Sequence, residues 1–373
     1  MTAVGGNNMT TIRFAFSGFG NIAKTHMTAL RALPIIKQVP ALPVLDTIIT
    51  RNPDKNREQA EAIGFRRVVS TVEEAASDEQ VDVIDICSPN SRHDADVRAA
   101  IAGGKAIYCE KPITDQYPQS TALEAAVRES GLMQQLAFTF RYHPASMRIR
   151  ELVREQVVGD ILQCKIAYRR SGYLNPERPI SWRLDHTMSG GGAISDLGVH
   201  ALDLFRYWFG DIEHAEGRVH THVKRRPSAA GSSEFVDVHV DDWAIIHLTT
   251  SSGINGMAEV SRVALGSEAF DIQIVGTRGS ITCDLERDAV PAVHLLKGSL
   301  GARPEPSYLA LIPDEKTTMG FSVDNHFGAL HHYILRLSGD DRWSDIAPTL
   351  KDGVIVEGWI ERILQGSAGG GSV

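Results

Sequence analysis

Short hydrophobic runs alternate with amphipathic stretches through the first 140 residues of the chain. The runs have the length of buried strands and lie at residues 12–17, 45–50, 68–69, 81–86, 106–109 and 133–139. The stretches between them have helical character and lie at residues 24–33, 57–63, 71–76 and 92–103. Strands that alternate with helices in this way predict a parallel sheet with helices on both faces.

The pattern changes after residue 140. An amphipathic helix is predicted over residues 147–157 and a long helix over residues 193–209. Strand-like runs fill much of the remainder, at residues 161–169, 244–250, 256–262, 270–275 and 280–284. Runs of strands after a helix favour an α+β domain with a large, mostly antiparallel open sheet. One face of such a sheet often packs on a second subunit, so we expect a homodimer or homotetramer through this sheet.

The charge and the composition of the chain argue against several classes of binding partner. The net charge of −8 argues against nucleic acid and anionic membrane surfaces, and the basic run 224–226 is too short to change that and is expected in a solvated loop. No apolar run is long enough to span a membrane, and the N-terminus has no secretory pattern. The four cysteines form no C-x-x-C pair, which is typical of reduced thiols in a cytoplasmic protein.

Glycines follow the first predicted strand directly. The run Gly18-Phe19-Gly20-Asn21-Ile22-Ala23 fits G-x-G-x-x-A between a strand and a helix. In that context the glycines allow a tight turn and a close approach to a pyrophosphate, and the helix start offers free N–H groups to the phosphates. Glycine pairs also occur in ordinary turns, but the flanking elements favour a dinucleotide site.

The motif indicates an α/β Rossmann nucleotide-binding domain over residues 11–140. An α+β substrate and oligomerisation domain follows over residues 141–365. Residues 1–10 and 366–373 are expected to be flexible tails. Residues 34–43 form an insert that we expect to be a loop near the cofactor or the subunit surface.

The end of the second predicted strand bears on the choice of cofactor. An Asp or Glu there binds the ribose hydroxyls of NAD, but Thr50-Arg51-Asn52 has no acid. A guanidinium suits a 2′-phosphate, so Arg51 favours NADP slightly over NAD. The alternative is that Arg51 faces solvent or stacks on adenine.

Two further strand ends carry polar residues at the same edge of the predicted sheet. Ser88-Pro89-Asn90 follows one strand, and Glu110-Lys111-Pro112 follows another. Ligands bind at the carboxyl ends of parallel strands, where the charged Lys111 can polarise a hydroxyl or stabilise an alkoxide. The X-Pro bond after Lys111 is a candidate for the cis form. An ordinary surface lysine is the alternative interpretation.

The stretch from Gly190 to Asp203 places Asp196 and His200 four residues apart on the predicted long helix. Residues at i and i+4 share a helix face, and a histidine beside an acid can exchange a proton near neutral pH. A purely structural alternative has Asp196 capping the helix and His200 in the core. A metal site with Asp203 is disfavoured, because no further His or Cys has ligand spacing.

Trp182-Arg183 is a polar–aromatic pair that we interpret as lining the substrate cavity. An aromatic plane packs on the apolar face of a ring, and arginine anchors hydroxyls or acids. An ordinary buried tryptophan is an equally good interpretation.

Together these motifs resemble the glucose–fructose oxidoreductase / inositol dehydrogenase / MocA (Gfo/Idh/MocA) family over nearly the whole chain. The matching positions are Gly18, Gly20, Ala23, His26, Ser88, Pro89, Asn90, His93, Glu110, Lys111, Pro112, Arg141, Gly192, Asp196, Gly198, His200 and Asp203. Within the family the chain is most similar to sugar dehydrogenases of the levoglucosan-dehydrogenase type. It departs from the family pattern at Ala23, Thr139 and Thr50-Arg51, and the last departure puts NAD in doubt.

The resemblance implies an NAD(P)-dependent dehydrogenase that acts on a ring hydroxyl of a sugar, anhydrosugar or inositol and needs no metal. It implies that His200 is the general base, oriented by Asp196, and that Lys111 stabilises the alkoxide or acts as base. It also implies cofactor contacts from Ser88, Pro89, Asn90, His93, Glu110, Lys111 and Arg141. Two alternatives are a non-catalytic NAD(P)-binding sensor and an oxidoreductase that retains its cofactor between two sugars.

Overall fold

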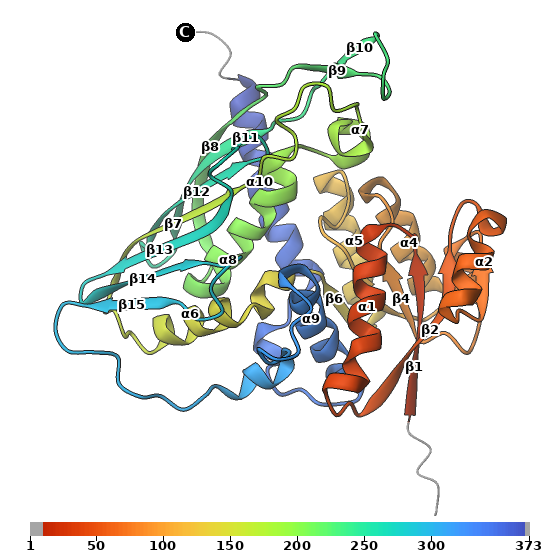
Figure 1. Cartoon of the computed structure of the whole chain (residues 1–373), viewed down its shortest axis with the longest axis horizontal. Coiled ribbons are helices and arrows are strands. Elements are labelled where there is room, and N and C mark those ends of the chain that lie inside the picture. The colour runs from red at the N-terminus through yellow and green to blue at the C-terminus, as the bar shows by residue number, and fades with distance from the viewer. Residues whose placement is uncertain (1–9, 370–373) are drawn as a thin grey trace, which may run out of the picture.

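The computed structural model describes residues 10–369 and contains two large sheets (Figure 1). The first sheet is parallel, with strand order β3-β2-β1-β4-β5-β6. Its strands are β1 (Thr10–Ser17), β2 (Ala41–Ile49), β3 (Arg67–Val69), β4 (Val83–Ile86), β5 (Ala106–Cys109) and β6 (Gln134–Leu136). The predicted Rossmann-type arrangement is confirmed, because each apolar run became a buried strand.

Five helices flank this sheet: α1 (Asn21–Ile36), α2 (Pro53–Ile63), α3 (Val72–Ala76), α4 (Asn90–Ala102) and α5 (Tyr117–Ser130). The prediction of a separate loop over residues 34–43 is wrong. Helix α1 continues past Pro34 to Ile36, and β2 already begins at Ala41. The helix is prolonged because its buried residues Leu30 and Leu33 belong to the same apolar cluster as residues of the C-terminal helix α9 (Phe321–Leu337).

The second sheet has seven strands in the order β15-β14-β13-β7-β12-β11-β8. They are β7 (Ile161–Arg169), β8 (Ile212–His220), β11 (Trp243–Thr250), β12 (Asn255–Ser261), β13 (Ala269–Gly276), β14 (Gly279–Asp284) and β15 (Ala292–Leu295). All neighbours are antiparallel except β7 and β12. The predicted mostly antiparallel sheet is confirmed.

A small separate ladder pairs β9 (Arg225–Pro227) with β10 (Phe235–Asp237). Here the expectation of a solvated basic loop is wrong for Arg226, which is 1% exposed. Its guanidinium donates to the backbone carbonyls of Asn175, Arg178 and Tyr173, and these bonds replace the water that a charged group needs.

Five further α-helices follow the parallel sheet in the chain: α6 (Pro144–Arg154), α7 (His186–Ser189), α8 (Val199–Phe209), α9 and α10 (Leu350–Gly369). Helix α8 packs against β7 and β12, on the side of the second sheet that faces the parallel sheet (Figure 1). Helix α9 packs on α1, and α10 packs on α5 and β8. The C-terminal helices therefore return to the first domain and join it to the second.

Most of the predicted tails, residues 1–9 and 370–373, lie outside the described residues. The prediction is wrong for Thr10, which pairs with Ala41 in the parallel ladder, and for residues 366–369, which end α10. No helix among residues 10–369 has the length and apolarity needed to cross a membrane.

Candidate active site

The glycine turn after β1 has the geometry of a phosphate cradle. Gly18 has φ +107°, and a Cβ there would lie 3.0 Å from the carbonyl oxygen of Cys87, so a side chain is excluded. A Cβ on Gly20 would meet open space. Helix α1 then starts at Asn21 with no side-chain cap and no acid in its first turn, which leaves its N–H groups for an anion. These residues fit the pyrophosphate of a dinucleotide.

Other predicted cofactor residues lie around this turn. Phe19 and Ile22 are half-buried beside the glycines, and Arg51 is exposed just past the end of β2. The neighbouring Thr50 hydroxyl accepts a hydrogen bond from Asn56 Nδ2 at 2.8 Å. The exposed guanidinium is compatible with a 2′-phosphate and equally with solvent, so the preference for NADP stays a prediction.

The side chains after β4 are mostly turned inward. Ser88 Oγ donates to Asp96 at 2.7 Å, and Asn90 Nδ2 donates to the carbonyl of Ser189 in the second domain at 3.0 Å. His93 is fully buried, with Nε2 2.8 Å from the Ser88 carbonyl and Nδ1 3.0 Å from the Pro112 carbonyl. These side chains hold the strand ends together, so a cofactor would meet the backbone of Ser88 and Pro89 rather than the His93 ring.

Lys111 joins the two domains at the carboxyl end of β5. Its Nζ donates to both the carbonyl and the carboxylate Oδ1 of Asp196, each at 2.9 Å, across 85 residues of sequence. The Lys111–Pro112 bond is cis, as the sequence suggested. Lys111 is therefore held between the cofactor domain and the substrate domain rather than being an ordinary surface lysine.

Arg262, at the end of β12, completes this ion-pair group and was missed in the sequence. Its Nη2 donates to the second carboxylate oxygen of Asp196 at 2.9 Å, and the residue is 3% exposed. Burial by itself raises the pKa of Asp196, but Lys111 and Arg262 lower it well below its usual range. Asp196 is thus a fixed anion between two cations. The only signal in the sequence was a charged residue at a strand end.

The helix that carries Asp196 is irregular. The predicted helix over 193–209 is confirmed, but its first part, Ile194–Gly198, is a wider π-helical turn that precedes α8. Its start is capped by Asp241, which accepts from the N–H groups of Gly192 and Ile194 at 3.0 and 2.8 Å. A Cβ on Gly192 would lie 1.8 Å from the Asp241 carbonyl, so this close approach requires glycine. Asp241, and not Asp196, therefore acts as the cap.

The wide turn changes the relation of Asp196 to His200. An i→i+5 turn removes the i, i+4 alignment of an α-helix, and the Asp196 carboxylate bonds to Lys111 and Arg262 rather than to His200. The hydrogen bonds of Asp196 therefore do not support the expectation that this carboxylate orients His200. The His200 ring is held by aromatic side chains instead, 4.4 Å from Phe140 and 6.3 Å from Phe138 between centroids.

His200 is a neutral base in this environment. Burial and the positive charge of Lys111 lower its pKa well below the usual value, although Asp196 opposes the shift. The ring is 7% exposed. An imidazole with a free lone pair beside a lysine cation can take a proton while the cation stabilises the anion that results.

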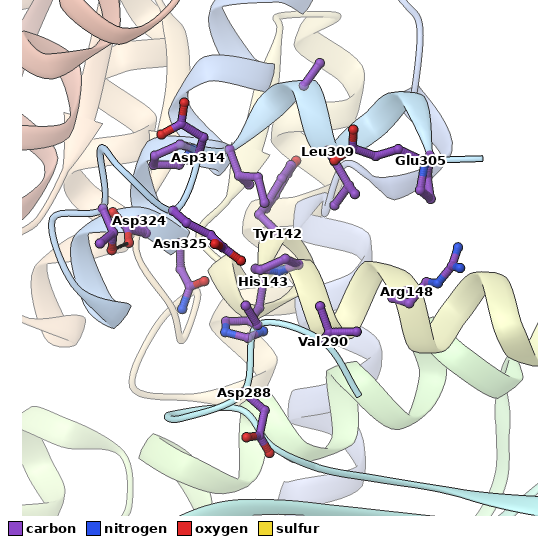
Figure 2. A pocket seen from close by; sticks show the side chains of 18 of the residues that line it. Tyr142, His143, Arg148, Asp288, Val290, Glu305, Leu309, Asp314, Asp324 and Asn325 are labelled. Atoms are coloured by element: carbon purple, nitrogen blue, oxygen red, sulfur yellow. Dashed lines mark hydrogen bonds between the residues drawn. The ribbon is translucent and has the colours of Figure 1, made fainter. Parts of the chain in front are cut away.

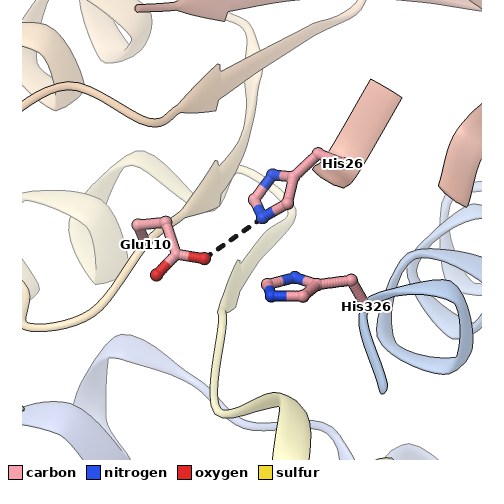
Figure 3. A group of neighbouring side chains, drawn as sticks. All are labelled: His26, Glu110 and His326. Atoms are coloured by element: carbon pink, nitrogen blue, oxygen red, sulfur yellow. Dashed lines mark hydrogen bonds and ion pairs between the residues drawn. The ribbon is translucent and has the colours of Figure 1, made fainter. Parts of the chain in front are cut away.

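A buried histidine, His26, bonds to Glu110, the residue that precedes Lys111. The Nδ1 of His26 lies 3.0 Å from Asp85, and its Nε2 lies 3.1 Å from Glu110 Oε1 (Figure 3). Burial alone lowers the pKa of His26, but Asp85 and Cys87 raise it well above its usual value. A protonated ring donates to both carboxylates, which fits the two short contacts. The ligand atoms of His26, Glu110 and His326 lie within 4.8 Å of one another. Glu110 also accepts from the Lys111 N–H at 3.2 Å.

Arg141 does not face the cofactor cleft. It is 5% exposed, and it forms a buried ion pair with Asp203, with Nε donating at 2.9 Å, and a second one with Asp352 at 3.2 Å. These contacts argue against Arg141 as a cofactor ligand, because its Nε and Nη2 groups bond to carboxylates inside the protein. The Asp203 carboxylate, which the alternative of a metal site needed as a ligand, is engaged in this ion pair.

Trp182 and Arg183 stack on each other in a short 3₁₀ turn. Trp182 is half-buried, Arg183 is exposed, and the guanidinium lies 4.3 Å from the indole centroid. The Arg183 carbonyl is 3.4 Å from Arg262 Nη1, so the turn borders the Asp196 group. A role in substrate binding remains a prediction.

Comparisons with known proteins agree with this architecture. Residues 12–138 match the model of the "Oxidoreductase family, NAD-binding Rossmann fold", and residues 146–282 match the "GFO/IDH/MocA C-terminal domain". Levoglucosan dehydrogenase of Pseudarthrobacter phenanthrenivorans is 30% identical over 292 residues, 75% of each chain. scyllo-Inositol 2-dehydrogenase (NAD(+)) of Bacillus subtilis is 26% identical over 292 residues, 77% of this chain and 78% of its own.

Solved structures extend the likeness over almost the full length. A levoglucosan dehydrogenase in complex with NADH and L-sorbose superposes with a TM-score of 0.86 at 26% identity, covering 97% of this chain and 98% of the other. An oxidoreductase domain protein from Kribbella flavida gives 0.87 at 27% identity, with the same coverage. With both family domains matched and a Lys–Asp–His group between them, the chain belongs to the Gfo/Idh/MocA family of NAD-binding oxidoreductases.

Proposed function

We propose that the chain oxidises a secondary hydroxyl on the ring of a sugar, anhydrosugar or inositol, or reduces the corresponding ketone, with a nicotinamide cofactor. The observation that carries this proposal is the contact of Lys111 Nζ with Asp196 at 2.9 Å, which joins the cofactor edge to the helix of His200. The relatives named for levoglucosan and scyllo-inositol support the substrate class.

Each side chain has a separate task in this proposal. The neutral His200 accepts the hydroxyl proton, and the Lys111 ammonium stabilises the negative charge that grows on the oxygen. Asp196, held by Arg262, fixes the position of the Lys111 ammonium next to the helix of His200. A nicotinamide cofactor, when bound, would supply the acceptor for the hydride of the carbinol carbon. Trp182 and Arg183 border the cleft and are proposed to contact the substrate ring.

The backbone of Gly18–Ile22 and the start of α1 would hold the pyrophosphate. We propose that Arg51 binds a 2′-phosphate, so that NADP is preferred slightly over NAD. The variant Arg51→Asp should then lower the affinity for NADP and leave the affinity for NAD unchanged or higher. Fluorescence titration with both reduced cofactors measures this, and tighter binding of NAD than NADP by the unmodified protein would contradict the proposal.

An absorbance screen at the reduced-nicotinamide band tests the reaction itself, with NAD and NADP against inositols, hexoses, glycosides and anhydrosugars. Lys111→Ala and His200→Ala should each lower kcat by about 10²–10⁴-fold with cofactor binding retained. The exposed Lys351→Ala on α10 is the control and should keep full activity. Tight cofactor binding without turnover on any substrate would favour the sensor alternative instead.

We also propose that the face of the second sheet turned away from α8 packs on another copy of the chain. Its outward positions include the half-buried apolar residues Ala167, Ile245 and Met257. Such side chains on a broad sheet favour a symmetric interface. Light scattering after size-exclusion chromatography should show a dimer or tetramer, and Ile245→Lys should shift it toward monomer. A monomeric unmodified protein would refute the interface.

A further inference from the structure

A cavity of about 960 Å³ lies between the β14–β15 connection, the start of α6 and the segment that leads into α9 (Figure 2). Its size is at the upper end of the range for small-molecule sites. Lys111, Asp196 and His200 are not among its lining residues. The cavity is therefore a feature of its own and not the reaction centre described above.

One wall of the cavity is apolar and aromatic. It includes Val290, Leu309, Ile312 and Phe321. The Phe321 ring stacks on Phe140, with centroids 5.3 Å apart and an interplanar angle of 24°. Phe140 in turn lies edge-on to the His200 ring, with centroids 4.4 Å apart, so two aromatic rings lie between the cavity and His200. A wall of this kind suits the apolar face of a ring.

Two residues of the lining carry buried polar atoms without hydrogen-bond partners in the described part of the chain. His143 Nδ1 and Asn325 Nδ2 have no hydrogen-bond partner among residues 10–369, although the two residues are only 7% and 2% exposed. Both side chains belong to the lining (Figure 2). Burying unsatisfied polar groups is costly, so such atoms in a roomy cavity indicate a ligand that bonds to them.

The charges around the cavity restrict the class of ligand. The lining has six carboxylates, Glu286, Asp288, Glu305, Asp314, Glu315 and Asp324, against four cations, Lys37, Arg148, Arg287 and Arg303. Four of these groups are already paired with side chains nearby: Arg148 with Glu151, Glu286 with Arg170, Arg287 with Asp284 and Arg303 with Glu155. The surplus of carboxylates disfavours an anionic ligand such as a phosphate.

We propose that the cavity is a second binding site, distinct from the reaction centre, for a neutral polyhydroxylated ring compound of the sugar or cyclitol class. Its hydroxyls would bond to the His143 imidazole and the Asn325 amide, and its apolar face would lie on Phe321. Burial lowers the pKa of His143 to about 4, so the ring is neutral at physiological pH and suited to a hydroxyl. The proposal goes beyond the dehydrogenase activity and does not depend on turnover.

Calorimetry and crystal soaks with the cofactor-loaded protein test the site, using D-glucose, myo-inositol and levoglucosan as probes at millimolar concentrations. Val290, which is 71% exposed, lies in the lining, so Val290→Trp should obstruct the cavity without disturbing the core. Asn325→Leu removes the unpartnered amide. Each variant should weaken binding of the probe in the cavity at least tenfold.

Leu265→Trp is the matched control, since Leu265 is 72% exposed and lies outside the cavity lining. It should bind the probe as the unmodified protein does. The proposal is overturned if no probe occupies the cavity, or if Val290→Trp and Leu265→Trp bind alike. Nicotinamide reduction is measured separately, so failure of the dehydrogenase proposal would leave cavity binding intact and would be recognised as such.

Discussion

Arg262 offers the sharpest test of the site, because nothing in the sequence motifs singled it out. The replacement Arg262→Leu removes the donor at 2.9 Å from Asp196 Oδ2 and leaves Lys111 as the remaining cation on that carboxylate. Asp196 then has one oxygen without its partner. We expect the Lys111 ammonium to lose its fixed position relative to the substrate hydroxyl.

The expected decrease in kcat/KM follows from the strength of the hydrogen bond that is lost. A hydrogen bond to a charged group contributes about 1.5–3 kcal/mol. Arg262 is nearly fully buried but the Asp196 side chain is 35% exposed, so solvent screens the pair in part and the lower half of this range applies. A loss of about 2 kcal/mol of transition-state stabilisation corresponds to about a 30-fold decrease in kcat/KM. The decrease should be smaller than that of Lys111→Ala, because the catalytic groups themselves remain.

The assay is initial-rate kinetics at saturating cofactor, with a thermal melt to separate catalysis from stability. Arg226→Leu is the matched control, since Arg226 is equally buried and also lies over the Tyr173 ring but bonds only to backbone carbonyls. It should lower the melting temperature without a comparable loss of kcat/KM per folded molecule. Unchanged kinetics in Arg262→Leu, or equal losses in both variants, would refute the reasoning.

Three further predictions concern the base, the cofactor turn and the core. The acid limb of kcat/KM should lie below pH 6.5, because burial and Lys111 lower the pKa of His200 and the base is lost only when it is protonated; a limb above pH 7 would contradict this. Gly18→Ala should weaken cofactor binding at least tenfold in fluorescence titration, because its Cβ would press on the Cys87 carbonyl at a positive φ. Arg141→Met should destabilise the fold by about 3–5 kcal/mol in urea unfolding, since it leaves Asp203 buried without its cation; a shift under 1 kcal/mol would show that the pair is unimportant.

Local motifs predicted much of the candidate site. The glycine turn, the Lys111 strand end and the helix of His200 depend on neighbours in the chain, and their positions follow from strand and helix periodicity. The partners of Asp196 were not predictable in the same way. Arg262 lies 66 residues further along the chain, directly after β12, and its guanidinium reaches Asp196 because β12 packs against the π-helical turn that carries this residue.

The sequence by itself determined the order of elements, the Rossmann domain and the residues that we propose for the chemistry. Periodicity and glycine spacing are properties of the chain within a few residues, so they can be recognised without knowledge of the fold. The tertiary structure alone decided which charges meet. It buried Arg141 in an ion pair and bonded Asp196 to Lys111 and Arg262 rather than to His200. It also left His143 Nδ1 and Asn325 Nδ2 without hydrogen-bond partners among residues 10–369. Buried ion pairs and cavities arise from contacts between distant segments, which no local pattern records.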